Sequence, residues 1–371
     1  MYSMITSYVH LYSKGFLCCI VLCDKERPVL IIFFTDCLTQ AAVKRNCKAI
    51  LSIFLLSISA SVTIDHLIFC FMNNYRMLPS KYTAAHSLPP HAVMQLAKAW
   101  LAEDTPNFDP AGVCVGSQQV EARLLCKSPH SILAGSPFFT AVFTEVGCTV
   151  DWLHRDGDEI GPDPVTLTAV VRGPARCLLL GERPALNCLA RASGIATRCS
   201  QLRKLARAGG WHGEVAGTRK TTPGFRLVEK YAMLVGTVSM HRQDLSGMVM
   251  LKDNHVWASG SITEAVKAAR SVCGFSSKIE VECRSTEEAM EAATAGADIV
   301  MLDNFQPQVL HVAAASLRQE FPALLIEASG GVTPDNLHEY FSPCVDIISL
   351  GCITQGCPVV DFSLKVQKPI P

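Results

Sequence analysis

KIEVECRSTEEAMEAATAGADIVMLDN, residues 278–304, contains one complete strand–helix–strand unit. The apolar runs Lys278–Glu282 and Ile299–Leu302 predict two strands, and the amphipathic stretch Thr286–Ala295 predicts the helix between them. Ser285 supplies the hydroxyl of a helix N-cap, and two glutamates follow in the first turn, where acids are favourable. A helix that connects two short strands makes them parallel neighbours in one sheet.

The same alternation continues on both sides of this unit, at intervals of about 20–35 residues. Further strands are predicted at Glu214–Ala216, Met248–Leu251, Leu324–Ala328 and Ile347–Leu350. Further helices are predicted at Phe225–Met233, Thr263–Val272, Pro307–Glu320 and Pro334–Phe341. No G-x-G-x-x-G follows the first strand, which argues against an open dinucleotide-binding sheet. We therefore expect an α/β fold with an incomplete (β/α) TIM-like barrel.

A different pattern precedes the barrel. Strands are predicted at Gln118–Lys127, Val150–His154 and Val165–Val171, with helices at Ala92–Glu103 and Pro137–Val146. These elements predict an α+β open-sandwich domain with an antiparallel sheet.

A long helical stretch runs from Ala175 toward Ala208, and we expect a break at Ser193-Gly194 and a kink at Pro184. The expected domains are an N-terminal α+β domain, residues 77–192, joined by residues 355–371, and a barrel with the active site, residues 193–354.

Composition excludes several classes of protein. The 33 Lys+Arg and 33 Asp+Glu of the 371 residues balance, which argues against broad electrostatic binding to nucleic acid or to an anionic membrane. Hydrophobic residues make up 49% of the chain, which excludes a mainly disordered protein. The 17 cysteines form no CxxC pair after residue 76. They are typical of reduced, mostly buried thiols and predict a cytoplasmic protein without structural zinc.

Residues 1–76 are more apolar than the rest. Their longest clean apolar run, Ala49–Ile64, is shorter than the roughly 20 residues that a membrane span needs. Three interpretations stay open: an alternative start with Met77 as the natural first residue, a poorly ordered apolar extension, or a membrane anchor. The first is favoured, and membrane association is not expected.

Polar residues or glycines follow each predicted barrel strand. They are Gly217–Gly224, Lys252–His255, Glu280 with Glu282, Asp303 with Asn304, Ser329–Gly331 and Gly351. In a barrel the carboxyl ends of the strands share one mouth, where active sites lie. Loops at strand ends are often polar, but this regularity favours a functional mouth.

The residue types at this mouth indicate an anionic ligand. Arg219, Lys220 and Lys252 form a positive patch, to which His241 and Arg242 can add. Planar arginine groups suit carboxylates, and lysines supply point charge.

Acids and glycines complete the set. Glu282 and Asp303 come from successive strands, and each alone could be an ion-pair partner. Together, beside lysine and arginine, they suit Mg²⁺ or ribose hydroxyls. Ser329, Gly330 and Gly351 suit a phosphate, because backbone N–H groups approach closely where there is no Cβ.

Longer motifs carry a family resemblance. They are GTRKTTPG at 217–224, LVEKY at 227–231, KDNH at 252–255, LDN at 302–304 and EASGG at 327–331. Together they closely resemble the quinolinate phosphoribosyltransferases, also called nicotinate-nucleotide pyrophosphorylases (carboxylating), especially the vertebrate ones. The similarity runs from about Ala92 to Lys365 and leaves residues 1–76 outside.

The resemblance implies a glycosyltransferase of class EC 2.4.2.19 that uses Mg²⁺. It would convert quinolinate and 5-phosphoribosyl-1-pyrophosphate to nicotinate mononucleotide, pyrophosphate and CO₂ in de novo NAD biosynthesis. It would work as a homodimer with shared sites, or as a hexamer.

The resemblance also implies roles for the mouth residues. Quinolinate would bind to Arg219, Lys220, His241, Arg242 and Lys252, with Arg183 reaching in from the neighbouring subunit. Lys220, Lys252, Glu282 and Asp303 would be catalytic. Glu282 and Asp303 would hold the ribose hydroxyls and Mg²⁺, the metal largely through the substrate. Ser329, Gly330 and Gly351 would hold the 5-phosphate.

Three alternatives remain. A related transferase that takes nicotinate without decarboxylation would not need so many cations for a monoacid. A catalytically inactive module is disfavoured because none of the implied charged residues is lost. A membrane-tethered protein would depend on residues 1–76.

Overall fold

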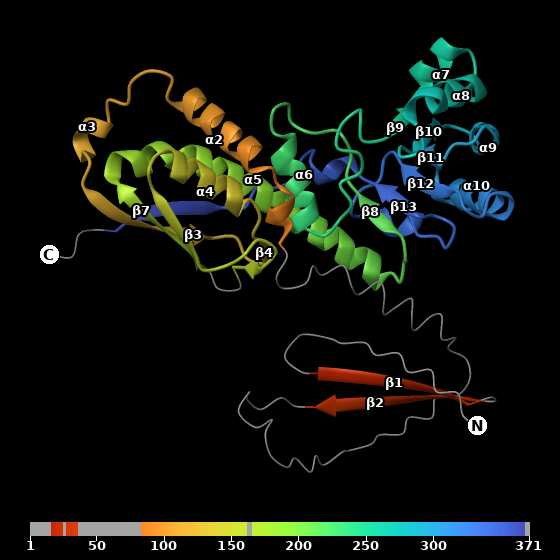
Figure 1. The fold of residues 1–371 in the computed structure, drawn as a ribbon, viewed down its shortest axis with the longest axis horizontal. Helices are drawn as coiled ribbons and strands as arrows, with labels where there is room; N and C mark the ends of the chain where they lie inside the picture. Colours follow the sequence, from red (N-terminus) through yellow and green to blue (C-terminus); the bar gives the residue numbers. More distant parts are fainter. Residues whose placement is uncertain (1–15, 25–26, 36–82, 162–164, 368–371) are drawn as a thin grey trace. The chain divides into compact units, whose positions relative to one another are not determined.

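The computed structural model describes residues 16–24, 27–35, 83–161 and 165–367, and the chain forms two units, Met1–Asn74 and Tyr75–Pro371. In the first unit, β1 (Phe16–Asp24) pairs antiparallel with β2 (Arg27–Thr35) (Figure 1). Most of residues 1–76 lie outside the described residues. The three interpretations of this segment are therefore not tested by the structure. Over the described parts of the chain, no helix has the length and apolar character to cross a membrane.

The second unit begins with an antiparallel sheet of four strands in the order β14–β3–β7–β5. These strands are β3 (Gln119–Cys126), β5 (Thr149–Trp152), β7 (Thr166–Pro174) and β14 (Phe362–Val366). The edge strand β14 comes from the end of the chain and pairs with β3, after the barrel is complete. Smaller elements are η1 (Ala84–Ser87), α3 (Gly112–Val115), β4 (Ser131–Ile132) and β6 (Glu159–Ile160).

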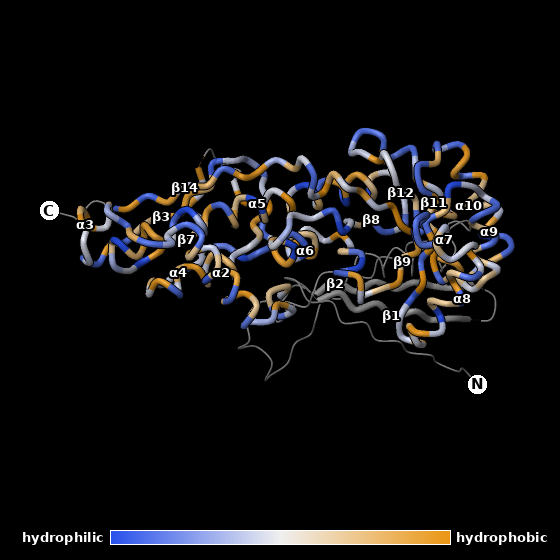
Figure 2. The backbone as a smooth tube through the Cα atoms, turned by 90° about the horizontal axis from the view of Figure 1, so that it is seen from above, coloured by the Kyte–Doolittle hydropathy of each residue, from blue (hydrophilic) through white to orange (hydrophobic). Residues whose placement is uncertain are grey.

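Helices α2 (Pro90–Asp104) and α4 (Ser136–Glu145) pack against each other beside this sheet (Figure 1, Figure 2). The side chains of Phe138, Phe139 and Phe143 on α4 are fully buried.

Helix α5 (Ala175–Ala208) contacts strands of both sheets. It is one continuous helix, so the predicted break at Ser193-Gly194 is wrong, and the helix also continues through Pro184. Gly194 is required by packing rather than by a break, because a Cβ at this position would overlap the backbone carbonyl of Pro358. A glycine inside a helix usually weakens it, and here close contact with the chain segment before β14 compensates.

Six parallel strands form the second sheet, in the order β8–β13–β12–β11–β10–β9. They are β8 (Glu214–Ala216), β9 (Val249–Leu251), β10 (Ile279–Cys283), β11 (Ile299–Asp303), β12 (Leu325–Ser329) and β13 (Ile347–Ser349). The first strand pairs with the last, and the seam lies between β8 and β9. At this seam Ser239 forms a parallel bridge with Ala216 on β8. The sheet is therefore an incomplete barrel, as the sequence predicts.

Helices α8 (Ile262–Cys273), α9 (Thr286–Thr294) and α10 (Pro307–Glu320) cover this sheet on the outside (Figure 1). Helix α6 (Arg226–Val235) packs on α5, and α7 (Asp253–Ser259) packs on α8. Helix α7 follows directly from Lys252 and is not indicated by the sequence pattern. The helix predicted at Pro334–Phe341 is wrong: only a 3₁₀ turn, η2 (Leu337–Tyr340), forms there, and a second 3₁₀ turn, η3 (Gly351–Ile353), follows β13.

Replacing Gly194 by alanine tests the close contact with Pro358. In an ordinary helix interior this change stabilises by up to about 1 kcal/mol. Here the added methyl meets rigid backbone, so we expect a net loss of about 2 kcal/mol in the free energy of unfolding, measured with urea. Gly181→Ala in the same helix should cost less, because its Cβ would meet a ring atom of Phe143, which can move. A Gly194→Ala protein as stable as the parent would contradict this packing.

Candidate active site

The pleat of the barrel strands places a set of polar side chains on the inner face. Alternate residues of a strand share a face, and residues paired in register share it across strands. Met301 on β11 is paired with Glu282 on one side and with Glu327 on the other, and Asp303 is paired with Ser329. The opposite faces of these strands carry buried apolar residues such as Val281, which pack under the helices.

Lys252 and Glu282 form an ion pair at the carboxyl ends of β9 and β10. Burial raises the pKa of Asp303, on the next strand, and the Glu282 carboxylate adds to this rise. Asn304 has a positive φ of 58° and donates a hydrogen bond of 2.7 Å to Asp303. Two partly buried carboxylates on neighbouring strands, with the pKa of Asp303 raised by burial and then by Glu282, fit a divalent cation with hard oxygen ligands.

Loops after β12 and β13 form a cradle beside Asp303, which is paired with Ser329. Gly330 has a φ of 91°, and a Cβ there would overlap the Asn304 side chain. Asn304 is fixed against this loop, since its amide N–H donates to the Ser329 carbonyl at 2.8 Å. Ser349 donates to the hydroxyl of Ser329 at 2.9 Å. A Cβ at Gly351 would lie 3.7 Å from Lys220 Nζ, so the first and last barrel strands bring a lysine and a glycine together.

The loop with Arg219 and Lys220 is anchored by a buried acid that sequence reasoning missed. Glu229 on α6 is fully buried and accepts hydrogen bonds from the Thr222 amide at 3.0 Å and the Thr222 hydroxyl at 2.9 Å. Arg191 on α5 pairs with the same carboxylate at 3.0 Å. The signal available in the sequence was an acid within LVEKY, next to the apolar face of a helix. Arg219 and Lys220 themselves are exposed.

His241 and Arg242 follow the bridge at the seam and therefore emerge at the mouth. His241 has a φ of 57°, a conformation that is uncommon for a residue other than glycine. Its Nδ1 accepts a 2.8 Å hydrogen bond from the Arg242 amide, so its Nε2 carries the proton and donates to Glu327 at 3.0 Å. Both ring nitrogens are thus engaged within the chain.

Glu280 and Glu327 lie beneath His241, and the sequence did not single them out as a pair. Both carboxyls are fully buried, and Glu280 Oε2 is 3.7 Å from His241 Nε2. Burial raises the pKa of Glu280 well above its usual range, and the neighbouring Glu327 raises it further. One carboxyl of such a pair holds a proton more tightly than an isolated glutamate does.

The likeness to known proteins agrees with this geometry. Family models of quinolinate phosphoribosyl transferase match its N-terminal domain over residues 110–193 and its C-terminal domain over residues 195–365. The nicotinate-nucleotide pyrophosphorylase (carboxylating) of Homo sapiens is 53% identical over 279 residues, which cover 75% of this chain and 93% of that protein. This chain belongs to the quinolinate phosphoribosyltransferase family. The resemblance stated from the motifs is confirmed.

Two further members of the family support the assignment. The Rattus norvegicus protein of the same name is 54% identical over 288 residues, 76% of this chain and 95% of that protein. The solved structure of the nicotinate-nucleotide pyrophosphorylase from Francisella tularensis matches with a TM-score of 0.70 and 30% identity, over 77% of this chain and 100% of that one. The predicted fold class, an antiparallel sandwich domain followed by a barrel-like α/β domain, is confirmed.

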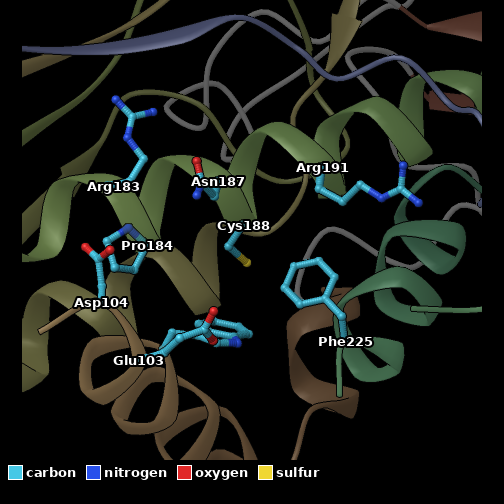
Figure 3. A pocket seen from close by; sticks show the side chains of 9 residues that line it. Glu103, Asp104, Arg183, Pro184, Asn187, Cys188, Arg191 and Phe225 are labelled. Carbon is cyan, nitrogen blue, oxygen red and sulfur yellow. The ribbon is translucent and has the colours of Figure 1, made fainter. Parts of the chain in front are cut away.

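Arg183 lies apart from the other candidate residues. It is exposed on α5 and lines a hollow between α2, α5 and the start of α6 (Figure 3). The other lining residues include Trp100, Glu103, Arg191 and Phe225. Among the described residues that line this hollow, none of the other predicted site residues occurs. Within one chain, the structure does not bring Arg183 to the barrel mouth.

Gly330 can be tested against its neighbour Gly331. Both have a positive φ, so alanine strains the backbone at either position, by an amount on the order of 1–2 kcal/mol. Only at Gly330 does the methyl also overlap Asn304, whereas nothing lies near the Cβ position of Gly331. Gly330→Ala should therefore lower the free energy of unfolding by at least about 1 kcal/mol more than Gly331→Ala. Equal losses in urea unfolding would show that Asn304 does not constrain this loop.

Proposed function

We propose that the barrel mouth binds quinolinate and 5-phosphoribosyl-1-pyrophosphate and that the reaction takes place there. The activity is that of a carboxylating nicotinate-nucleotide pyrophosphorylase, EC 2.4.2.19, which forms nicotinate mononucleotide, pyrophosphate and CO₂ on the de novo route to NAD. The observation that carries the site is the meeting of four cations with two acids at one end of the strands. The cations are Arg219, Lys220, Arg242 and Lys252, and the acids are Glu282 and Asp303.

The cations fit the substrate's charge. Quinolinate is a dianion at neutral pH, and each carboxylate needs fixed positive partners when it leaves water. Arg219 and Arg242 can each bind a carboxylate through two parallel hydrogen bonds, while Lys220 and Lys252 add point charge. His241 borders this pocket, with its imidazole held by Glu327.

Glu282 and Asp303 are proposed to hold the ribose hydroxyls. Glu282 forms an ion pair with Lys252, and burial together with the neighbouring Glu282 raises the pKa of Asp303 above its usual value. Mg²⁺, bound near these acids largely through the substrate, would supply positive charge against the pyrophosphate group. Ser329, Gly330 and Gly351 are proposed to bind the 5-phosphate, through backbone N–H groups and a hydroxyl.

The residues act mainly by position and charge. As pyrophosphate leaves, the ribosyl carbon becomes cationic, and carboxylates beside the ring stabilise that charge while Lys220 and Lys252 stabilise the leaving group. The pyridine nitrogen attacks this carbon and becomes cationic itself. The cationic ring then accepts the electron pair of the adjacent C–C bond as CO₂ departs. No side chain is needed as a nucleophile.

Arg183 is proposed to reach the quinolinate carboxylates of the neighbouring subunit, which makes a homodimer the smallest active assembly. A hexamer of such dimers would have the same sites. We further propose that the protein works in the cytoplasm and binds neither nucleic acid nor membrane.

The direct test of the function is an assay of the purified protein with quinolinate, phosphoribosyl pyrophosphate and Mg²⁺ that follows the release of both CO₂ and pyrophosphate. The same assay with nicotinate in place of quinolinate tests the alternative, a transferase that does not decarboxylate its substrate. Turnover with nicotinate but not with quinolinate would make this protein a non-decarboxylating transferase. No turnover with either would indicate an inactive module.

Removing a mouth cation should reduce activity strongly. Arg219→Ala and Lys252→Ala should each lower kcat/KM for quinolinate by at least a factor of about 100, roughly 2.7 kcal/mol, because a charged contact in a desolvated site is lost. Lys267→Ala, which breaks an exposed ion pair with Glu264 on α8, is the matched control and should keep parental activity. Parental activity in either mouth variant would remove that residue from the site.

Mixing two inactive variants tests the shared site. Arg183→Ala and Lys252→Ala should each be nearly inactive as homodimers. After dissociation and random pairing, half of the dimers are mixed, and each carries one intact site of two, so about a quarter of parental activity is expected. Subunit exchange is verified by mass labels. If the mixture is as inactive as its components, Arg183 acts in the site of its own chain or has no role in the site.

A further inference from the structure

We propose that Lys230 is a positioning residue that sets the loop of His241 and Arg242 for quinolinate binding. The inference deepens the proposed function and rests on it. Lys230 itself is fully buried on α6, with 1% of its surface exposed, so it does not contact a ligand at the mouth.

The contacts of the Lys230 ammonium are with the backbone on both sides of His241. Nζ donates to the carbonyl of Met240 and, at 3.2 Å, to the carbonyl of Arg242. These are the two carbonyls that enclose the residue in the left-handed conformation. A buried carbonyl without a partner costs free energy, so both carbonyls lose a partner if the ammonium is removed.

The loop is held from a second side by the imidazole of His241. Its Nε2 donates to Glu327 on β12, while the Arg242 amide donates to its Nδ1. Lys230 thus binds the loop backbone to α6, and Glu327 binds the His241 side chain to the barrel interior. Between these two anchors the Arg242 guanidinium has one further contact, a 3.3 Å hydrogen bond to the Met248 carbonyl. The Lys230 contacts therefore hold the backbone from which the Arg242 side chain extends toward the Met248 carbonyl.

Most of the charged side chains around Lys230 are cations like itself. Arg226 on the same helix, Arg219 on the loop after β8 and Arg242 face it, and Glu229 is the nearby acid. Burial and these arginines lower the pKa of Lys230 to about 8. A buried cation in this setting is costly, and a purely structural position would favour an apolar residue of similar length. The cost is understandable if the ammonium is needed to hold the loop.

The test compares Lys230→Met, which removes the donor, with Lys230→Gln, which keeps a neutral one. KM and kcat are measured for quinolinate and for phosphoribosyl pyrophosphate separately. We expect Lys230→Met to raise KM for quinolinate by roughly ten- to a hundredfold, since small displacements of a positioning group have effects of this size, and to leave KM for phosphoribosyl pyrophosphate within about twofold. Lys230→Gln should lie between Lys230→Met and the parent.

Arg318→Met is the matched control. Arg318 also donates to backbone carbonyls, those of Pro322 at 2.9 Å and Leu324 at 2.8 Å, and pairs with Asp346. These residues precede β12 and β13, at the opposite end of the barrel from the mouth. Its loss should lower stability without changing the ratio of the two KM values.

A pH series on the parent protein keeps the proposal testable if Lys230→Met does not fold. As the pH rises through about 8, Lys230 loses its charge and one donor, and KM for quinolinate should rise relative to KM for phosphoribosyl pyrophosphate. In Lys230→Gln, which has no amine to deprotonate, the quinolinate KM should not rise relative to the phosphoribosyl pyrophosphate KM near pH 8. Equal changes of both KM values, an unchanged quinolinate KM in Lys230→Met, or identical pH profiles would each overturn the positioning role. A parent protein that releases no CO₂ from quinolinate would instead overturn the proposed function.

Discussion

The parallel pairing of the six barrel strands is the constraint on which the candidate site depends. Because β13 pairs with β8, the sheet curves until its first and last strands are neighbours, and every strand ends at the same mouth. The two-residue period then fixes which side chains point inward. Glu282, Asp303 and Ser329 lie on one face because of this period, and Lys220 lies beside Gly351 because of the closure.

Buried charged groups hold the loops at the mouth in fixed positions. Glu229 and Lys230 are adjacent on α6 and almost fully buried, and each binds a different loop at the mouth. Glu229 binds the Thr222 backbone and Lys230 binds the carbonyls around His241. Charged groups are costly to bury unless all their hydrogen-bonding atoms find partners, so such an arrangement specifies loop positions narrowly.

Helix α5 packs against strands of both sheets and contributes side chains to the surroundings of each. Its Arg191 reaches the Glu229 anchor of the barrel, while its Arg183 lies on a hollow beside α2 (Figure 3). At Gly194 this continuous helix lies in close contact with the segment that leads to β14. The end of the chain thus completes the first sheet and at the same time packs on the helix that precedes the barrel.

The sequence alone determined the alternation of strands and helices, because hydrophobic period and helix caps are local properties. It also indicated the mouth cations, the two acids and the glycines, because residues at strand ends can be read without coordinates. It failed where packing overrides local preference. Gly194 lies within a helix because a neighbouring backbone fills the space of its missing side chain, and residues 334–341 form only a 3₁₀ turn.

Only the tertiary structure decided what holds the site in place. Glu229, Lys230, Glu280 and Glu327 look in the sequence like ordinary charged residues of a helix and two strands. Their burial arises only in the assembled fold, and the hydrogen-bond partners of Glu229, Lys230 and Glu327 come from segments up to 86 residues away along the chain, as with His241 and Glu327. Local patterns carry no information about such distant partners, since they meet only when the strands and helices have assembled.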